Sequence, residues 1–192
     1  MMSQILWTPV FIGETNTRQF FPQLSREEGG AYLEMKRKYP GQPIIGVGAI
    51  IFRGDQVLLI QRGQEPSRGQ WSIPGGAVLV GETLEEGVRR EIFEETHLEV
   101  QVLTLVKVLE RLFRDADGRV TYHYVLVDFL CRYLAGKLQS DSDAQDARFV
   151  SLQDLPSYQI APITLGVISR ADRLRQNPEL WDSPASDGKF YG

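Results

Sequence analysis

The chain has 192 residues, of which 42% are hydrophobic and 24% are charged, which is an ordinary composition for a globular protein. This length predicts one folded domain with short appendages and a core that needs no disulfide support. The formal net charge of −4 does not indicate a nucleic-acid or membrane-surface binder, since such proteins normally carry a basic excess. The single cysteine, Cys131, excludes an intramolecular disulfide framework and a multi-cysteine zinc site.

The sequence contains no apolar run near the roughly 18 residues that a membrane-spanning helix needs. Its N-terminal stretch also lacks the basic and apolar regions of a signal peptide. We therefore expect a cytoplasmic protein with neither a membrane partner nor a nucleic-acid partner. A homodimer is compatible with the sequence, which does not otherwise indicate the oligomeric state.

Residues 1–43 are predicted to form an N-terminal extension. Ser25 and Glu28 have the spacing of a capping box, which indicates a short helix from Ser25 to about Tyr39. The Pro40-Gly41-Gln42-Pro43 stretch would end it. The main domain is expected at residues 44–176, followed by a tail at residues 177–192 that is rich in Ser, Asp, Pro and Gly.

The main domain alternates β-rich and helical stretches. Strands are predicted at residues 44–52, 56–61, 98–112, 120–133 and 148–151, and helices at residues 83–96 and 163–175. The first two strands would form a hairpin, a Gly- and Pro-rich loop would follow, and a turn at residues 115–118 would join the two long strands. The domain has long antiparallel strand pairs and few helices. This combination predicts an α+β fold, not a parallel sheet of repeated βαβ units.

The helix predicted at residues 83–96 carries acids beside its apolar stripe. At about 100° per residue, that stripe consists of Leu84, Val88 and Ile92. Glu91 and Glu95 fall within about 20° of the stripe, and Glu94 lies about 60° further out. Partly buried like charges resist ionisation unless a cation neutralises them, and Mg²⁺ prefers carboxylate oxygens. The alternative is a structural helix whose acids form ion pairs with Arg89 and Arg90, and spacing alone leaves both interpretations open.

The segment from Gly76 to Leu98 resembles the Nudix box, in which a glycine and a glutamate precede a helix carrying an Arg-Glu pair and a Glu-Glu pair at fixed spacing. The matching positions are Gly76, Glu82, Arg90, Glu91, Ile92, Glu94, Glu95 and Leu98. His97 departs from the pattern, which has glycine there to end the helix in a left-handed conformation. Histidine tolerates that conformation at a cost of about 1 kcal/mol. The resemblance extends more weakly over residues 44–170 and does not cover residues 1–40.

This resemblance implies an α+β fold with a mixed sheet sandwiched between helices. It also implies a Mg²⁺-dependent enzyme, with Mn²⁺ as a possible substitute, that hydrolyses the diphosphate bond of a small-molecule nucleotide. The protein looks most like the ADP-ribose pyrophosphatase type, which acts on a nucleoside diphosphate linked to another moiety. The alternatives are a nucleoside triphosphate pyrophosphatase that removes damaged nucleotides and a nucleotide-sensing module without catalysis.

The roles of the box residues follow from the same resemblance. Glu94 and Glu95 would be the main metal ligands, and Glu91 would be a further ligand or would orient the attacking water. Arg90 would hold these carboxylates in place. The resemblance therefore makes Glu91, Glu94, Glu95 and Arg90 the expected catalytic residues. Glu82 would pair with Arg90 or bind the metal through water.

Other residues are expected around this centre. The substrate-binding candidates are Arg62, Arg68, Gly75, Gly76, Tyr122 and Tyr124. The two arginines could bind phosphates, or they could simply be surface residues. The two tyrosines could stack on a base, or they could pack within the sheet. Gly76 is also expected at the metal site. A late acid, Asp143 or Asp146, would complete that site unless both belong to a solvated loop.

Overall fold

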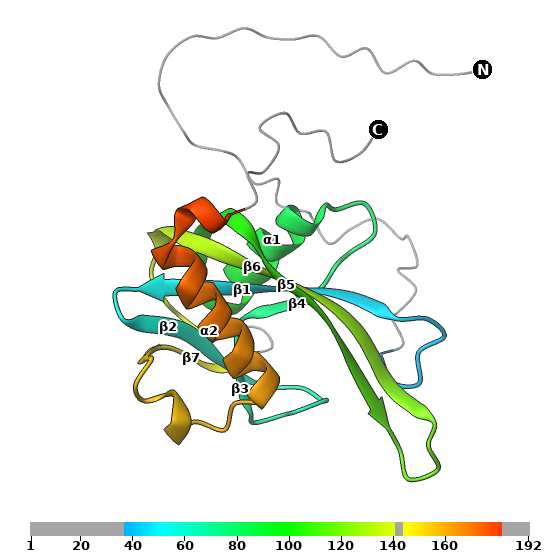
Figure 1. Ribbon diagram of the computed structural model, residues 1–192. Coiled ribbons are helices and arrows are strands. Elements are labelled where there is room, and N and C mark those ends of the chain that lie inside the picture. Colours follow the sequence, from blue (N-terminus) through cyan, green and yellow to red (C-terminus); the bar gives the residue numbers. More distant parts are fainter. Residues whose placement is uncertain (1–36, 141–143, 182–192) are drawn as a thin grey trace, which may run out of the picture. The chain divides into compact units, whose positions relative to one another are not determined.

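The computed structural model describes residues 37–140 and 144–181, in which two helices flank a mixed β-sheet (Figure 1). The strands are β1 (Ile44–Arg53), β2 (Gln56–Arg62), β3 (Trp71–Ser72), β4 (Gly75–Ala77), β5 (Leu98–Arg114), β6 (Val120–Gly136) and β7 (Ala144–Ser151). The helices are α1 (Leu84–Thr96) and α2 (Pro162–Gln176), and short 3-10 turns lie at η1 (Leu155–Ser157) and η2 (Pro178–Leu180). None of these helices is long and apolar enough to cross a membrane.

The predicted α+β class and the mixed sheet between helices are confirmed by this architecture. Every strand and helix predicted after residue 43 is present, although β7 begins at Ala144, four residues before the predicted start. The helix expected from Ser25 to about Tyr39 lies almost wholly outside the described residues.

Strand β1 lies at the centre of the sheet. It runs parallel to β6 from Ile44 to Ile51, and β5 continues the sheet antiparallel to β6. On its other edge, β1 pairs with β4 through residues 46–48 and with β2 only through Phe52 and Arg53. The predicted β1–β2 hairpin therefore exists but separates after two residue pairs, and β2 goes on to pair with β7 and β3. Both β3 and β4 arise in the stretch expected to be a loop.

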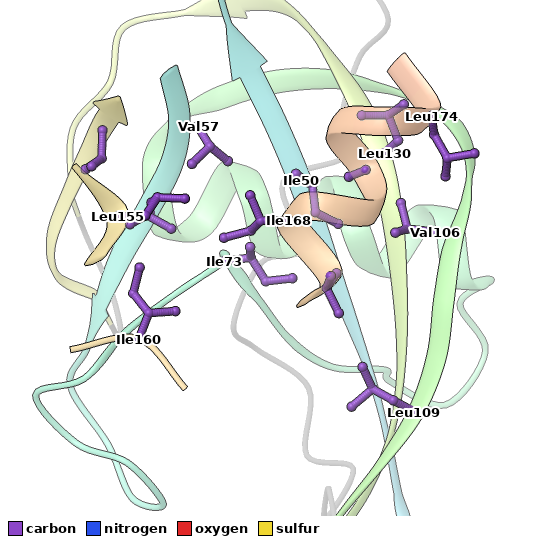
Figure 2. Close-up of a cluster of buried hydrophobic side chains, with 14 residues drawn as sticks. Ile50, Val57, Ile73, Val106, Leu109, Leu130, Leu155, Ile160, Ile168 and Leu174 are labelled. Carbon is purple, nitrogen blue, oxygen red and sulfur yellow. The ribbon is translucent and has the colours of Figure 1, made fainter. Parts of the chain in front are cut away.

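Each helix covers its own side of the sheet. Alternation along β1 sends Ala49 and Ile51 to a core cluster beneath α1, where they meet Val88 and Ile92. The neighbouring Ile50 points the other way into the cluster beneath α2. Figure 2 shows this second cluster, in which Ile168 and Leu174 of α2 pack against residues of the sheet. The two cores hold α1 and α2 on opposite faces, as the views indicate.

The sheet also buries a carboxyl group. Asp128 of β6 lies opposite Gly48 of β1 and is only 4% exposed. Burial raises the pKa of the Asp128 carboxyl from 3.8 to about 6, although the positive charge of Lys107 opposes this effect. The folded protein therefore holds the Asp128 proton more tightly than the unfolded chain does.

The substitution Asp128→Asn should change how stability depends on pH. Because the folded-state pKa is raised, the wild type is relatively most stable below about pH 4 and loses stability as the pH rises through 6. The variant lacks this loss. Relative to wild type, its free energy of unfolding should therefore rise by about 2 kcal/mol between pH 4 and pH 8, as measured by urea denaturation. Replacing the exposed Asp154 by Asn is the control, and a pH-independent difference at Asp128 would contradict the prediction.

Candidate active site

Strand β4 brings two glycines close to their neighbours. Gly75 has a φ of +146°, and a Cβ there would lie 2.1 Å from the carbonyl oxygen of Val47, so that only glycine fits. A Cβ on Gly76 would lie 2.3 Å from the carboxyl group of Glu91. The backbone of β4 and the Glu91 carboxyl of α1 are therefore in direct contact.

Helix α1 is fixed at both ends by its own sequence. Thr83 and Glu86 form a capping box, with a 3.2 Å bond from the Glu86 N–H to the Thr83 Oγ1 and a 2.7 Å bond from the Thr83 N–H to a Glu86 Oε. At the other end His97 has a φ of 57°, and its N–H donates to the Phe93 carbonyl oxygen at 2.9 Å. The left-handed conformation expected of His97 is thus confirmed. The bounds of α1 are thus set by residues of the helix and its two caps.

The exposure of the three box acids on α1 follows the helical wheel. Glu95 is 5% exposed, and one of its oxygens accepts a 2.8 Å hydrogen bond from the Gly75 N–H. The Glu91 side chain is 15% exposed and that of Glu94 is 48% exposed. Burial raises the pKa of Glu91 in spite of the neighbouring Arg90. The two acids nearest the apolar stripe are therefore the ones that lie against the glycines.

Arg90 gathers the other acids around its guanidinium. Its Nε and Nη2 donate to the two carboxylate oxygens of Glu82 at 3.0 and 2.7 Å, and Nη2 also donates to the Ala77 carbonyl oxygen at 3.0 Å. Its Nη1 donates to Glu91 at 2.9 Å and to Glu94 at 3.2 Å. A planar fork can make these contacts at once, which a lysine could not.

Glu82 is held as an anion by this arrangement. Burial alone would raise the pKa of Glu82, but the hydrogen bonds from Arg90 and from the Leu79 N–H, at 2.6 Å, outweigh it and lower the pKa. Glu82 therefore fixes the position of Arg90, and Arg90 in turn fixes the acids of α1.

The ion pairing considered as an alternative is present in the structure. Arg90 contacts Glu91 and Glu94, and Arg89 pairs with Glu85 at 3.1 Å. Within residues 37–140 and 144–181, no group of three or more His, Cys, Asp or Glu side chains is arranged to hold a metal ion. However, Glu82, Glu91 and Glu94 share the one guanidinium, and Glu95 lies beside them on a backbone N–H. Negative charge is in excess here, which favours an added cation.

The two tyrosines proposed for base binding lie on one face of β6, as alternation predicts. The rings of Tyr122 and Tyr124 are stacked, with centroids 6.3 Å apart and an angle of 12° between their planes. Burial raises the pKa of the Tyr124 hydroxyl, and the positive charges of Arg37 and Arg62 oppose that rise. Arg37 also opposes the raised pKa of Glu91. The charge of Arg37 therefore acts on both Tyr124 and Glu91.

Arg37 was not among the residues predicted from the sequence. Its position depends on Tyr39, whose N–H donates to the Thr121 carbonyl oxygen at 2.8 Å and whose hydroxyl donates to Asp115 at 3.0 Å. These bonds fasten the segment before β1 to the β5–β6 hairpin. No local pattern in the sequence predicts such long-range contacts.

The remaining candidates are less closely associated with the box. Arg62 ends β2, where its Nε donates to the Pro66 carbonyl oxygen at 3.2 Å, whereas Arg68 is exposed in the loop after β2. Asp146 does not lie in a loop before the strand, as expected, but inside β7, where it forms an ion pair with Arg148. β7 is longer than predicted because its first residues pair with β2. Asp143 lies outside the described residues.

The contact between Gly76 and Glu91 leads to a prediction. In Gly76→Ala, the new methyl group should displace the Glu91 carboxylate, which is the mobile end of a long side chain. We expect a loss of turnover of about 100-fold or more, with a change in the free energy of unfolding below about 1 kcal/mol. Steady-state kinetics and thermal unfolding measure the two effects.

Gly166→Ala in α2 is the matched control. A Cβ at Gly166 meets no atom within 4 Å, so this substitution should leave turnover unchanged and stabilise the helix by about 0.5–1 kcal/mol. Normal turnover in Gly76→Ala would show that the Glu91 carboxylate does not need its position against β4.

Comparison with known proteins shows the family to which the chain belongs. The family model of the NUDIX domain matches residues 42–171. A curated ADP-ribose pyrophosphatase of Methanocaldococcus jannaschii is 39% identical over 114 residues, which cover 59% of this chain and 65% of that protein. A human 8-oxo-dGDP phosphatase is 32% identical over 126 residues, which cover 64% of this chain and 36% of that protein.

The structural comparison agrees with these similarities. The crystal structure of a MutT NUDIX hydrolase from Burkholderia pseudomallei matches with a TM-score of 0.59 and 30% identity, covering 67% of this chain and 98% of that chain. The matched segments span less than two thirds of the length of either curated relative. Nudix hydrolases generally use divalent metals. The NUDIX match, the homologous hydrolases and the acid-bearing helix α1 against β4 show that the chain belongs to the Nudix hydrolase family.

Proposed function

We propose that this protein hydrolyses the diphosphate bond of a nucleoside diphosphate linked to a second moiety, with ADP-ribose or a similar nucleotide sugar as its preferred substrate. The observation that carries the proposal is the position of the Glu91 and Glu95 carboxylates, which lie against the β4 glycines and beside Arg90. The ADP-ribose pyrophosphatase that is 39% identical supports the choice of substrate class. A cytoplasmic location and a homodimer stay predictions.

A divalent cation suits the box residues. Glu91, Glu94 and Glu95 would hold Mg²⁺ or Mn²⁺, with Glu82 and the backbone of Gly76 beside them. The raised pKa of Glu91 supports this assignment, because a buried carboxyl that resists ionisation gains from a nearby cation. When bound, the metal would neutralise the diphosphate and activate water.

The protein's own side chains would carry out the remaining tasks. Arg90 would keep the acids in place, and Glu91 would be a metal ligand or would orient the attacking water. Arg62 and Arg37 would bind phosphate oxygens, since both lie near Tyr124 and Arg37 also lies near Glu91. The exposed Arg68 stays a further candidate for this task. Tyr122 and Tyr124 would pack against the nucleoside.

A second candidate function is the hydrolysis of damaged nucleoside phosphates. The similarity to a protein named 8-oxo-dGDP phosphatase favours it. A nucleotide-sensing module without catalysis is a third. The full set of box acids is less compatible with it, because a module that only binds nucleotides has no use for a costly cluster of like charges.

A substrate panel tests these functions. With Mg²⁺ present, we expect ADP-ribose to be cut to AMP and ribose 5-phosphate with a higher kcat/KM than 8-oxo-dGDP or any nucleoside triphosphate. A chelator should abolish turnover, and added Mg²⁺ or Mn²⁺ should restore it. Undiminished turnover in excess chelator would refute the metal-dependent mechanism. A strong preference for 8-oxo-dGDP or a triphosphate would support the second candidate, and binding without turnover of any compound would support the third.

Substitutions in α1 separate catalysis from architecture. Glu94→Gln and Glu95→Gln should each lower kcat by about 100-fold or more, because the metal loses a charged oxygen ligand. Without metal, the free energy of unfolding should stay within about 1 kcal/mol of wild type or rise slightly, since an exposed ion pair contributes little and a buried negative charge is removed from Glu95. Melting without metal and turnover with metal are measured on the same samples.

Glu85→Gln provides the matched control on the same helix. Glu85 forms an i,i+4 ion pair with Arg89 at 3.1 Å, which resembles the 3.2 Å pair between Glu94 and Arg90. It should show the same small stability change with unaltered kcat. If the Glu94 and Glu95 variants instead melted well below wild type and kept near-normal turnover, the acids would serve only as scaffolding.

A further inference from the structure

A second buried acid, Asp128, has no part in the function proposed above. Among residues 37–140 and 144–181, none donates a hydrogen bond to its side chain or forms an ion pair with it, and Lys107 acts on it only as a nearby charge. A buried polar group without a partner costs free energy, so its retention at this position points to a ligand.

The Asp128 carboxyl lies over the backbone of β1. A Cβ on Gly48 would lie 2.4 Å from the Asp128 Oδ1 and 3.0 Å from the Ile73 Cδ1. Gly48 pairs on its other edge with Gly75, whose N–H binds Glu95. The carboxyl therefore lies one strand away from the glycines that contact the box acids.

Asp128 shares its side of β6 with the two stacked tyrosines. Alternation places Tyr122, Tyr124, Leu126 and Asp128 on the same face. From Tyr124 to Asp128 the strand advances about 13 Å, which is long enough to accommodate a nucleoside. Because Tyr124 lies near Arg62 and Arg37, this face has a cationic end suited to phosphates and a carboxyl end suited to hydrogen-bond donors.

We propose that Asp128 determines base specificity by accepting a hydrogen bond from the exocyclic amino group of adenine. This inference rests on the proposed function, because it assumes that the nucleoside lies along β6. An ionised carboxylate only accepts hydrogen bonds, and a base amino group is a donor that carboxylates bind. A purine that lacks the amino group would leave the carboxylate desolvated and unpaired, and would therefore be disfavoured.

The test compares ADP-ribose with an analogue in which unsubstituted purine replaces adenine. Wild type should prefer ADP-ribose by roughly 10-fold to 100-fold in kcat/KM. Asp128→Leu removes the acceptor but keeps the branching at Cγ, and it should abolish the preference, chiefly by raising KM for ADP-ribose. Asp128→Asn keeps an acceptor oxygen and should retain most of the preference. Thr104→Val, which removes a buried polar group from β5, is the control and should retain it fully.

Binding of AMP and of purine riboside monophosphate, measured by calorimetry, gives a readout that does not need turnover. Equal kcat/KM and equal affinity for both bases in wild type would overturn the inference and leave the proposed function intact. A preference that persists in Asp128→Leu would also overturn it. If AMP bound more tightly through Asp128 but ADP-ribose were not cut, the inference would stand and the proposed function would fail.

Discussion

The close contact between the glycine backbone of β4 and the acids of α1 constrains the rest of the domain. Gly75 donates to Glu95, and the Glu91 carboxyl occupies the space that a side chain on Gly76 would need. This contact requires β4 to lie on the edge of β1 at residues 46–48. The same edge is then closed to β2, which pairs with β1 for only two residues before it joins β3 and β7. β4 and β2 therefore occupy different stretches of the same edge of β1.

The electrostatics of the site concentrate on Arg90. One guanidinium contacts Glu82, Glu91 and Glu94, while burial works against the ionised form of Glu91. Such an arrangement is not an efficient source of stability, because desolvation offsets most of the attraction between partly buried charges. It makes sense as a framework that holds excess negative charge in a fixed place. A divalent ion would then meet carboxylates whose repulsion the folded chain already tolerates.

Much of this could be predicted from the sequence, and the exceptions have physical causes. Helix α1, its capping threonine and the burial order of its acids follow from local spacing, which is why the wheel placed Glu95 correctly. Strands β3 and β4 carry no alternation, since glycine and proline give no pattern, and they form only because β1 and β2 offer them an edge. β7 likewise begins before its predicted start, because Ala144 and Asp146 pair with the end of β2. Arg37 depends on contacts made across the chain by Tyr39.

Asp128 shows a different limit of sequence reasoning. A single acid in an apolar strand can equally well face solvent at a sheet edge, and only the neighbours of β6 determine its burial. Here β6 lies between β1 and β5, so both edges are paired and one face is covered by α1. On the other face Gly48 leaves room for the carboxyl. The glycines of β1 and β4 therefore have complementary effects. On one side of the sheet they let α1 bring its acids against the backbone, and on the other they let a carboxyl lie flat over β1.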